Sequence, residues 1–130
     1  MASRSETRVL VVDDEQIVAD TASAVFASAG FNSRAVYSAE QALELIPQWV
    51  PNLAVIDVRL PGMSGIDLAI RLKGEYPRCK LSLFSGNIDT ADLLDSAEHA
   101  GHSFDVLAKP VHPTELLQLA VNLPPVLGEA

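Results

Sequence analysis

Short apolar runs recur along the chain, and amphipathic segments separate them. The runs cover residues 9–12, 34–36, 53–56, 81–84 and 104–108. The first and third are continuously apolar, which is typical of central parallel strands that are covered on both faces. The second run is short and mixed, so we expect a strand nearer an edge of the sheet. Because strands and helices alternate throughout, the pattern predicts an α/β fold with a parallel sheet, right-handed crossovers and helices on both faces.

The segments between the first runs have helical spacing. The first helix spans about residues 17–29, and one apolar stripe is expected to face the sheet: Ile17, Val18, Ala22, Val25, Phe26 and Ala29. Gly30 is placed to end this helix, since glycine is favoured just past a helix C-terminus. The second helix begins at Ser38-Ala-Glu-Gln41, which has the form of a capping box. Ser64 opens the third helix, which runs towards Pro77.

Two further helices are expected in the C-terminal part of the chain. The fourth, at about residues 89–100, is acidic and only weakly amphipathic. The fifth begins after His112, with Pro113 at the first helical position. Its inward face is expected to consist of Leu116, Leu117, Ala120 and Val121. Pro124-Pro125 then stops this helix, and we expect no output domain on this chain.

Composition narrows the classes of function. The chain has 130 residues, a usual length for one domain, and 48% of them are hydrophobic, which excludes a disordered tail. The net charge of −8 argues against direct binding to nucleic acid. No apolar stretch reaches the roughly 18 residues of a membrane span, and the N-terminus has no signal core. Cys79 is the only cysteine, so no intrachain disulfide can form. We therefore expect a cytoplasmic domain, with Cys79 as a small buried hydrophobe.

Polar residues with complementary chemistry follow the predicted strands. Asp13 and Asp14 follow the first run, Asp57 the third, Ser85 the fourth and Lys109 the fifth. Because function gathers at the carboxyl ends of the strands in doubly wound sheets, we expect these residues at one rim. Three carboxylates within a few ångströms repel one another by roughly 4 kcal/mol per pair at an effective dielectric near 20. Such a cluster is costly unless a cation lies in it.

The donor types in this cluster favour particular chemistry. Hard oxygen donors without a nearby histidine or cysteine favour Mg²⁺, with Mn²⁺ as an alternative. Lys109 can meet a phosphoryl oxygen as a compact charge, and the Ser85 hydroxyl can donate to another. A carboxylate such as that of Asp57 can accept a phosphoryl group covalently. The alternative is that Asp13 and Asp14 merely cap the next helix, which fits a single acid better than a pair opposite Asp57 and Lys109.

Four motifs resemble those of the receiver domains of bacterial two-component signalling. They are Val11-Val-Asp-Asp-Glu15, Val55-Ile-Asp-Val-Arg-Leu-Pro-Gly-Met-Ser-Gly65, Phe84-Ser-Gly86 and Leu107-Ala-Lys-Pro110. They occur in order, each at a predicted strand end, and the resemblance covers residues 8–123 as one receiver domain. Residues 1–7 and 124–130 are then short terminal extensions. The resemblance implies a doubly wound, flavodoxin-like (βα)5 fold, with five parallel strands in the order 2-1-3-4-5.

The resemblance also implies roles for individual residues. Asp57 looks like the phosphoacceptor and Lys109 like the lysine that contacts the phosphoryl group. Ser85 is similar to the hydroxyl residue that takes part in the conformational switch. Pro110 is similar to the proline that follows a cis peptide bond in this family.

A magnesium site is implied in the same way. Asp13, Asp14 and Asp57 resemble the carboxylates of the metal site, and the backbone carbonyl of Arg59 looks like a further ligand. The side chains of Arg59 and Asn87 lie two residues past the acceptor and the switch hydroxyl. We expect both to project over the mouth of the pocket and to tune the lifetime of the phosphoryl group.

Two features depart from the family's pattern, and one of them is that the spacing from Gly101 to Lys109 is one residue longer than is common. The family usually has an aromatic switch residue three positions before the lysine, where this chain has Val106. Phe104 lies two residues earlier, on the same face of the strand by alternation, and is a candidate replacement. Valine is stiff at χ1, so Val106 has little rotameric range with which to report a change. The surface of the fourth helix, fifth strand and fifth helix is where the family signals, and it is also a candidate dimer interface.

The leading interpretation is a phosphorelay switch and not an enzyme that acts on a separate substrate. Asp57 would take a phosphoryl group from a sensor histidine kinase or a histidine phosphotransfer protein, and the altered surface would bind a downstream protein target. Such a domain promotes its own phosphorylation and dephosphorylation.

Two alternatives stay open. A small Mg²⁺-dependent phosphatase usually has a second aspartate two residues after its nucleophile, but Glu15 stands there after Asp13. A pseudo-receiver that only binds proteins would lack one of the pocket residues, and none is missing.

Overall fold

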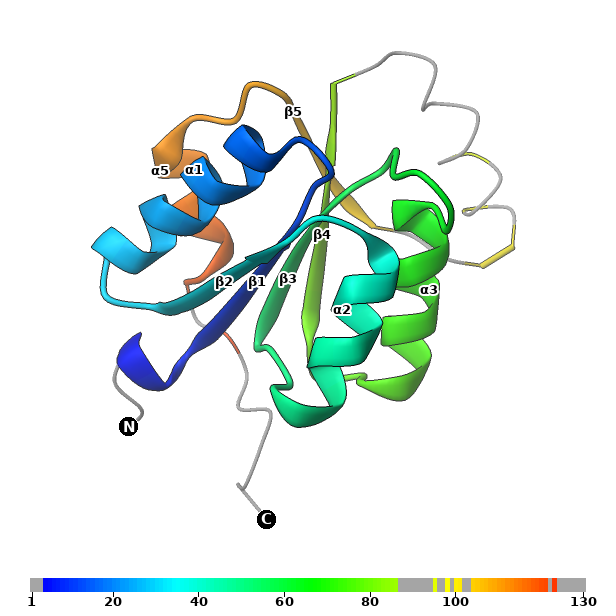
Figure 1. Ribbon diagram of the computed structural model, residues 1–130, viewed down its shortest axis with the longest axis horizontal. Coiled ribbons are helices and arrows are strands. Elements are labelled where there is room, and N and C mark those ends of the chain that lie inside the picture. The colour runs from blue at the N-terminus through cyan, green and yellow to red at the C-terminus, as the bar shows by residue number, and fades with distance from the viewer. Residues whose placement is uncertain are drawn as a thin grey trace.

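Five strands in the described part of the chain form one parallel sheet in the order β2-β1-β3-β4-β5 (Figure 1). The computed structural model describes residues 4–86, 95, 98, 100–101, 104–121 and 123. The strands are β1 (Arg8–Val12), β2 (Asn32–Val36), β3 (Leu53–Asp57), β4 (Lys80–Ser85) and β5 (Asp105–Ala108). All four strand pairs are parallel. The predicted doubly wound, flavodoxin-like fold and its strand order are confirmed, and the mixed second run forms an edge strand.

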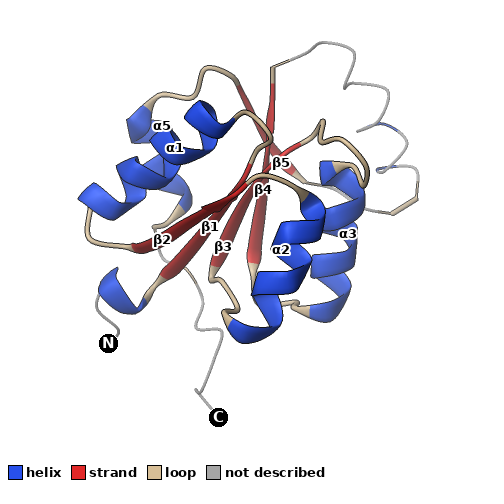
Figure 2. Cartoon of the chain, viewed as in Figure 1, coloured by secondary structure: helices blue, strands red, loops and turns tan. Residues whose placement is uncertain are grey.

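Helices cover both faces of the sheet (Figure 2). One face carries α1 (Gln16–Ser28) and α5 (Pro113–Leu119), and the other carries α2 (Ala39–Leu45) and α3 (Gly65–Glu75). Two short 3-10 segments, η1 (Arg4–Glu6) and η2 (Ile46–Gln48), lie before β1 and after α2. Most of the predicted fourth helix, as well as Pro124 and Pro125, lies outside the described residues.

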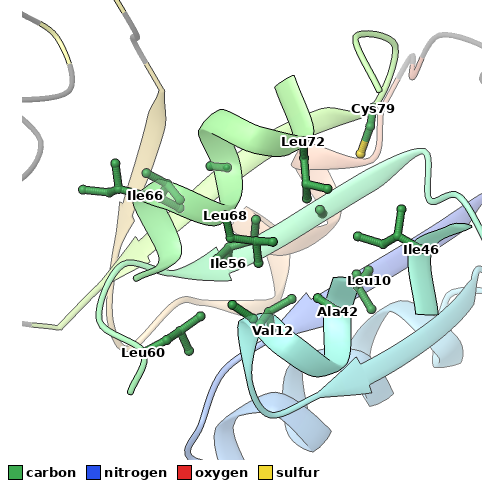
Figure 3. Packing of buried hydrophobic residues seen from close by; sticks show 14 of the residues in the cluster. Leu10, Val12, Ala42, Ile46, Ile56, Leu60, Ile66, Leu68, Leu72 and Cys79 are labelled. Carbon is green, nitrogen blue, oxygen red and sulfur yellow. The ribbon is translucent and has the colours of Figure 1, made fainter. Parts of the chain in front are cut away.

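Each face of the sheet has its own apolar core because side chains alternate along every strand. Leu10, Val12 and Ile56 point towards α2 and α3, where they pack with Leu68 and Leu72 (Figure 3). Val9, Val11, Leu53 and Val55 point the other way, towards Phe26 of α1 and Leu116 of α5. Residues 9–12 and 53–56 are fully buried, which confirms the prediction that β1 and β3 are central strands.

The predicted helix starts are confirmed by side-chain caps. The Ser38 Oγ accepts a hydrogen bond from the backbone N–H of Gln41 (3.0 Å). The Ser64 Oγ accepts one from the N–H of Asp67 (3.1 Å), and the His112 Nδ1 accepts one from the N–H of Thr114 (3.1 Å). These caps satisfy donors that a helix N-terminus leaves unpaired, and so they fix where α2, α3 and α5 begin at the sheet.

Two residues that we expected to be buried are exposed. Ile17 is 82% exposed, because it lies about 200° around the helix from Ala19, which faces the sheet. Val121 is 51% exposed, because α5 ends at Leu119 and Val121 follows its last turn. The prediction for Cys79 is confirmed: it is buried in the α2/α3 core, where burial raises the pKa of its thiol to about 12.

The close approach of α3 to the end of β3 requires glycine at position 65. The N–H of Gly65 donates to the carbonyl of Val58 (3.0 Å). A Cβ at Gly65 would overlap the carbonyl oxygen of Asp57, which is backbone and cannot rotate away. The glycine therefore lets the first turn of α3 lie directly against the strand that carries Asp57.

Replacing Gly65 by Ala is expected to lower the free energy of unfolding by about 2 kcal/mol or more, since the helix must shift to relieve the overlap. Gly74 lies in the same helix with no atom within 4 Å of its Cβ position. Gly74→Ala should therefore raise the free energy of unfolding, by about 0.5–1 kcal/mol. Urea unfolding of both variants measures the difference, and equal effects at the two glycines would contradict this account.

Candidate functional site

Three charged side chains from distant parts of the chain meet at the carboxyl edge of the sheet. Asp13 follows β1, Asp57 ends β3 and Lys109 follows β5. The Lys109 Nζ lies 2.7 Å from Asp13 Oδ2 and 3.2 Å from Asp57 Oδ2. The predicted convergence of acids and lysine at one rim is thus what the strand topology produces.

Asp13, Asp14 and Asp57 form an acidic cluster. Each offers one carboxylate oxygen, and these oxygens lie within 4.8 Å of one another. Asp13 is fully buried and Asp57 is 7% exposed, whereas Asp14 is exposed. The cluster contains only hard oxygen donors, and an exposed member leaves room for bound water, as Mg²⁺ requires. The residues present therefore fit a divalent cation site of the Mg²⁺ type.

The negative charge of the cluster exceeds the positive charge of Lys109. Burial and the neighbouring carboxylate of Asp13 raise the pKa of Asp57 to about 6, although Lys109 and the backbone N–H of Arg59 act in the opposite direction. Burial alone would lower the pKa of Lys109, but hydrogen bonds and charge interactions with Asp13 and Asp57 outweigh it and raise the pKa. One ammonium group therefore fails to neutralise the carboxylates, and a further cation would relieve the repulsion.

Backbone groups hold both buried carboxylates in place. The Asp13 Oδ1 accepts a hydrogen bond from the N–H of Glu15 (2.9 Å), so its other oxygen faces Lys109. The Asp57 Oδ1 accepts one from the N–H of Arg59 (3.3 Å). Groups that are oriented before a ligand arrives need little reorganisation when charge is added to the site.

Lys109 is positioned by its own backbone and by β4. Its N–H donates to the carbonyl of Ser85 (3.0 Å), and the Lys109–Pro110 peptide bond is cis, as the family resemblance implies. A Cβ at Gly86 would lie 3.3 Å from the Lys109 Cδ, and the Nζ lies 5.8 Å from the ring centroid of Phe84. Gly86 thus leaves space for the lysine side chain to lie across the end of β4.

The other residues predicted to belong to the site differ in their positions and exposure. Ser85 is the last residue of β4 and is partly buried, whereas Arg59 is exposed. Phe104 precedes β5 and packs against the α2/α3 core, with the Lys73 Nζ 5.6 Å from its ring centroid. Val106 is 40% exposed. Asn87 lies outside the described residues.

Sequence reasoning missed an apolar groove beside the acidic cluster. The groove has a volume of about 460 Å³ and lies between α1 and α5. Lys109 and Pro110 line its edge, and its walls include Ile17, Val18, Val25, Phe84, Val111 and Leu116. The apolar character of Ile17 signalled this surface, but the sequence pattern placed Ile17 in the core instead.

It also missed the contact of Glu15 with the lysine. The Glu15 Oε1 lies 3.6 Å from the Lys109 Nζ. Glu15 directly follows the acidic pair in the sequence, but nothing in its spacing indicates that its side chain turns towards a residue near the other end of the chain.

The fold and the site together define a class of protein: CheY-like α/β domains with acids and a lysine at the carboxyl edge of the sheet. The sequence profile of the response regulator receiver domain matches residues 9–121. The chain belongs to the response regulator receiver domain family. Members of this family serve two-component systems and interact with histidine kinases.

Individual relatives agree with this assignment. The chain is 31% identical over 110 residues to the DNA-binding response regulator MtrA of Mycolicibacterium paratuberculosis, and the match covers 85% of this chain and 48% of that protein. The chain thus spans about half the length of this relative. A receiver domain of an HD domain-containing protein from Pseudomonas fluorescens is 25% identical with a TM-score of 0.80, covering 90% of this chain and 93% of that one. A CheY-like receiver domain from Methanospirillum hungatei is 26% identical with a TM-score of 0.74, covering 86% and 88%.

Within the described part of the chain, no helix has the length and apolar character that crossing a membrane requires.

Replacing Asp57 by Asn should stabilise the metal-free protein at about pH 8, by about 1–3 kcal/mol. The pKa of Asp57 is raised from 3.8 to about 6 in the folded protein, so folding favours the protonated carboxyl. The stabilising contribution of that proton is fully present below the unfolded pKa of 3.8 and is lost as the pH rises through about 6. The Asn variant should therefore gain stability mainly above about pH 6.

Urea unfolding at about pH 4 and pH 8 measures this difference, and added Mg²⁺ should reduce it. Glu44→Gln, an exposed position on α2, removes one negative charge away from the cluster and serves as the control. A gain for Asp57→Asn that is equally large at both pH values would contradict the role of charge repulsion.

Proposed function

We propose that this domain is a phosphorelay switch in which Asp57 accepts a phosphoryl group from the phosphohistidine of a histidine kinase or histidine phosphotransfer protein. The observation that carries the proposal is the pairing of Asp57 with Lys109 inside a cluster of three carboxylates that one ammonium group does not neutralise. Membership of the receiver family supports it. The domain is then a regulatory phosphoacceptor and not an enzyme with a separate substrate.

The transfer is a direct displacement at phosphorus. A carboxylate oxygen of Asp57 forms a P–O bond while the P–N bond to the donor histidine breaks, and the electron pair of that bond returns to the imidazole nitrogen. Asp13, Asp14, Asp57 and the backbone carbonyl of Arg59 would hold Mg²⁺, which would supply neutralising charge for the phosphoryl oxygens. Within the chain, Asp57 must be ionised to attack, and the ammonium of Lys109 favours that state.

The product redistributes the contacts of Lys109. Its ammonium contacts two aspartates, and a phosphoryl group on Asp57 offers it a stronger partner. The Ser85 hydroxyl can donate to another phosphoryl oxygen. Ser85 is also linked to Lys109, because its backbone carbonyl accepts a hydrogen bond from the Lys109 N–H. Movement of Ser85 and Lys109 then reaches the surface around β5, where a downstream protein or a second copy would bind.

Phe104 is a better candidate than Val106 for the side chain that moves when Asp57 is phosphorylated. It is partly buried against the α2/α3 core, whereas Val106 on the same strand face is exposed and stiff at χ1. A ring at this position can change its packing when β5 moves, since the side chain reaches the core from the edge of the sheet.

Acetyl phosphate is expected to label the protein at Asp57 when Mg²⁺ is present and to fail in the presence of a chelator. The acidic cluster opposes further negative charge unless a cation is bound. Intact-protein mass spectrometry measures the label. Asp57→Ala should stay unlabelled, and Asp67→Ala, an exposed acid on α3, should be labelled like the wild type. Labelling of Asp57→Ala to the wild-type level would overturn the assignment.

The apolar groove supports docking of the phosphodonor next to Asp57. Ile17 is 82% exposed at the rim of the groove, and Lys109 lines both the groove and the acidic cluster. A helix bearing the phosphohistidine could bury Ile17 there and bring the phosphoryl group to the cluster.

Ile17→Ser should slow phosphotransfer from a histidine kinase about tenfold, because burying an isoleucine side chain contributes roughly 1.5–3 kcal/mol. Labelling by acetyl phosphate should not change, since that small donor needs no docking surface. Val121→Ser removes a comparable exposed apolar side chain outside the groove lining and serves as the control. The assay uses a kinase that phosphorylates the wild-type protein, and an unchanged transfer rate for Ile17→Ser would exclude this docking mode.

A further inference from the structure

Lys109 has a third acidic neighbour that the proposed phosphotransfer does not use. The Glu15 Oε1 lies 3.6 Å from the Lys109 Nζ, compared with 2.7 Å for Asp13 and 3.2 Å for Asp57. The side chain of Glu15 is 66% exposed, whereas those of Asp13 and Asp57 are 0% and 9% exposed. Glu15 therefore meets the ammonium from the solvent side, and the two aspartates meet it from inside the pocket.

The local backbone explains why Glu15 can hold this position. Glu15 is the N-cap residue of α1, but its side chain makes no capping hydrogen bond. Its N–H donates to Asp13 Oδ1 (2.9 Å), so its main chain is fixed to a fully buried carboxylate that itself contacts Lys109. The Glu15 side chain is thus not engaged by the helix terminus and starts close to the lysine.

The other neighbours of Lys109 restrict where its side chain can lie. Gly86 lies against the stem of Lys109, and the ring of Phe84 lies below its ammonium. The lysine also borders the groove, whose lining is mostly apolar. Among the described residues, the acids within 4.0 Å of the ammonium are Asp13, Asp57 and Glu15.

We propose that Glu15 is a positioning residue that draws the Lys109 ammonium towards the mouth of the pocket and competes for it with the group bound at Asp57. The proposal rests on the proposed function, because the competitor is the phosphoryl group. When that group arrives, the ammonium has to leave Glu15, and the Glu15 charge also repels the incoming anion. Glu15 thereby weakens the binding of an anionic phosphoryl group and keeps the resting state populated.

The expected size of the effect follows from the exposure of Glu15. Ion pairs of solvent-exposed side chains are weak and screened by salt. Removing the Glu15 charge should therefore tighten binding of an anion at Asp57 by about two- to fivefold at low ionic strength. The gain should shrink as salt is added, because screening acts on the exposed carboxylate more than on the buried pairs.

Beryllofluoride provides a probe of this competition. At saturating Mg²⁺, ¹⁹F NMR gives the beryllofluoride concentration at which half of the protein carries the adduct. Glu15→Gln should lower this concentration by about two- to fivefold at low salt and less at high salt. Glu44→Gln, which removes the same charge from an exposed position on α2, should leave it unchanged. An unchanged or raised value for Glu15→Gln overturns the proposal, as does an equal change for Glu44→Gln or a gain that salt does not reduce.

A second measurement tests the ion pair without metal or phosphoryl group. In Mg²⁺-free protein, NMR detects the hydrogen exchange of the Lys109 ammonium, which should speed up in Glu15→Gln and not in Glu44→Gln. Unchanged exchange in Glu15→Gln overturns the proposal. If beryllofluoride binds none of the proteins, the proposed function fails, and the exchange measurement then decides alone whether Glu15 holds the lysine.

Discussion

The structure depends on one electrostatic constraint: a single ammonium group faces buried carboxylates that it cannot fully neutralise. Lys109 lies within 3.2 Å of both Asp13 and Asp57, yet the pKa of Asp57 is still raised to about 6. Buried ion pairs of this kind are weak contributors to stability, because desolvation offsets much of the attraction. The site is therefore better explained by a function than by a need for stability, since strongly perturbed groups gather at functional sites.

The rest of the fold serves to keep this arrangement rigid. The three residues come from positions 13, 57 and 109, and only the parallel sheet brings their strand ends to one edge. The sheet is anchored by two apolar cores, so the strand ends cannot separate to relieve the repulsion. Gly65 lets α3 lie against the backbone of Asp57, and Gly86 leaves space for the lysine. Close packing around the carboxylates thus preserves a repulsion that a looser structure would relax.

Much of this could be predicted from the sequence, and the reasons are physical. Continuous apolar runs identified β1 and β3, and parallel strands must bring Asp13 and Asp57 to the same edge. Caps could be predicted because Ser38, Ser64 and His112 act within one turn of the chain.

The predictions that were wrong concern features that the local sequence does not determine. The exposure of Ile17 depends on which side of α1 faces the sheet, and residues 17 and 18 are both apolar, so periodicity fits more than one orientation. The contact between Glu15 and Lys109 depends on the direction of one exposed side chain, which no spacing specifies. Val121 was misplaced because its helix ends at Leu119, two residues before the apolar pattern suggests. Local hydrogen bonds and strand periodicity can thus be predicted from a sequence. The direction of a side chain at the end of a helix or strand cannot, because tertiary contacts determine it.

Lys109 links surfaces that would otherwise be independent. Its stem borders the apolar groove between α1 and α5, its ammonium contacts the acidic cluster, and its backbone N–H is bonded to β4 at Ser85. In the proposed switch, a charge added at Asp57 acts on a residue that touches all three regions. Because the ammonium has three protons to donate and already lies near three acidic side chains, a new anion has to displace one of these contacts rather than simply add another. A site whose carboxylates still repel one another can therefore redistribute its contacts in response to a small chemical change. A fully neutralised site would have no such alternative state to adopt.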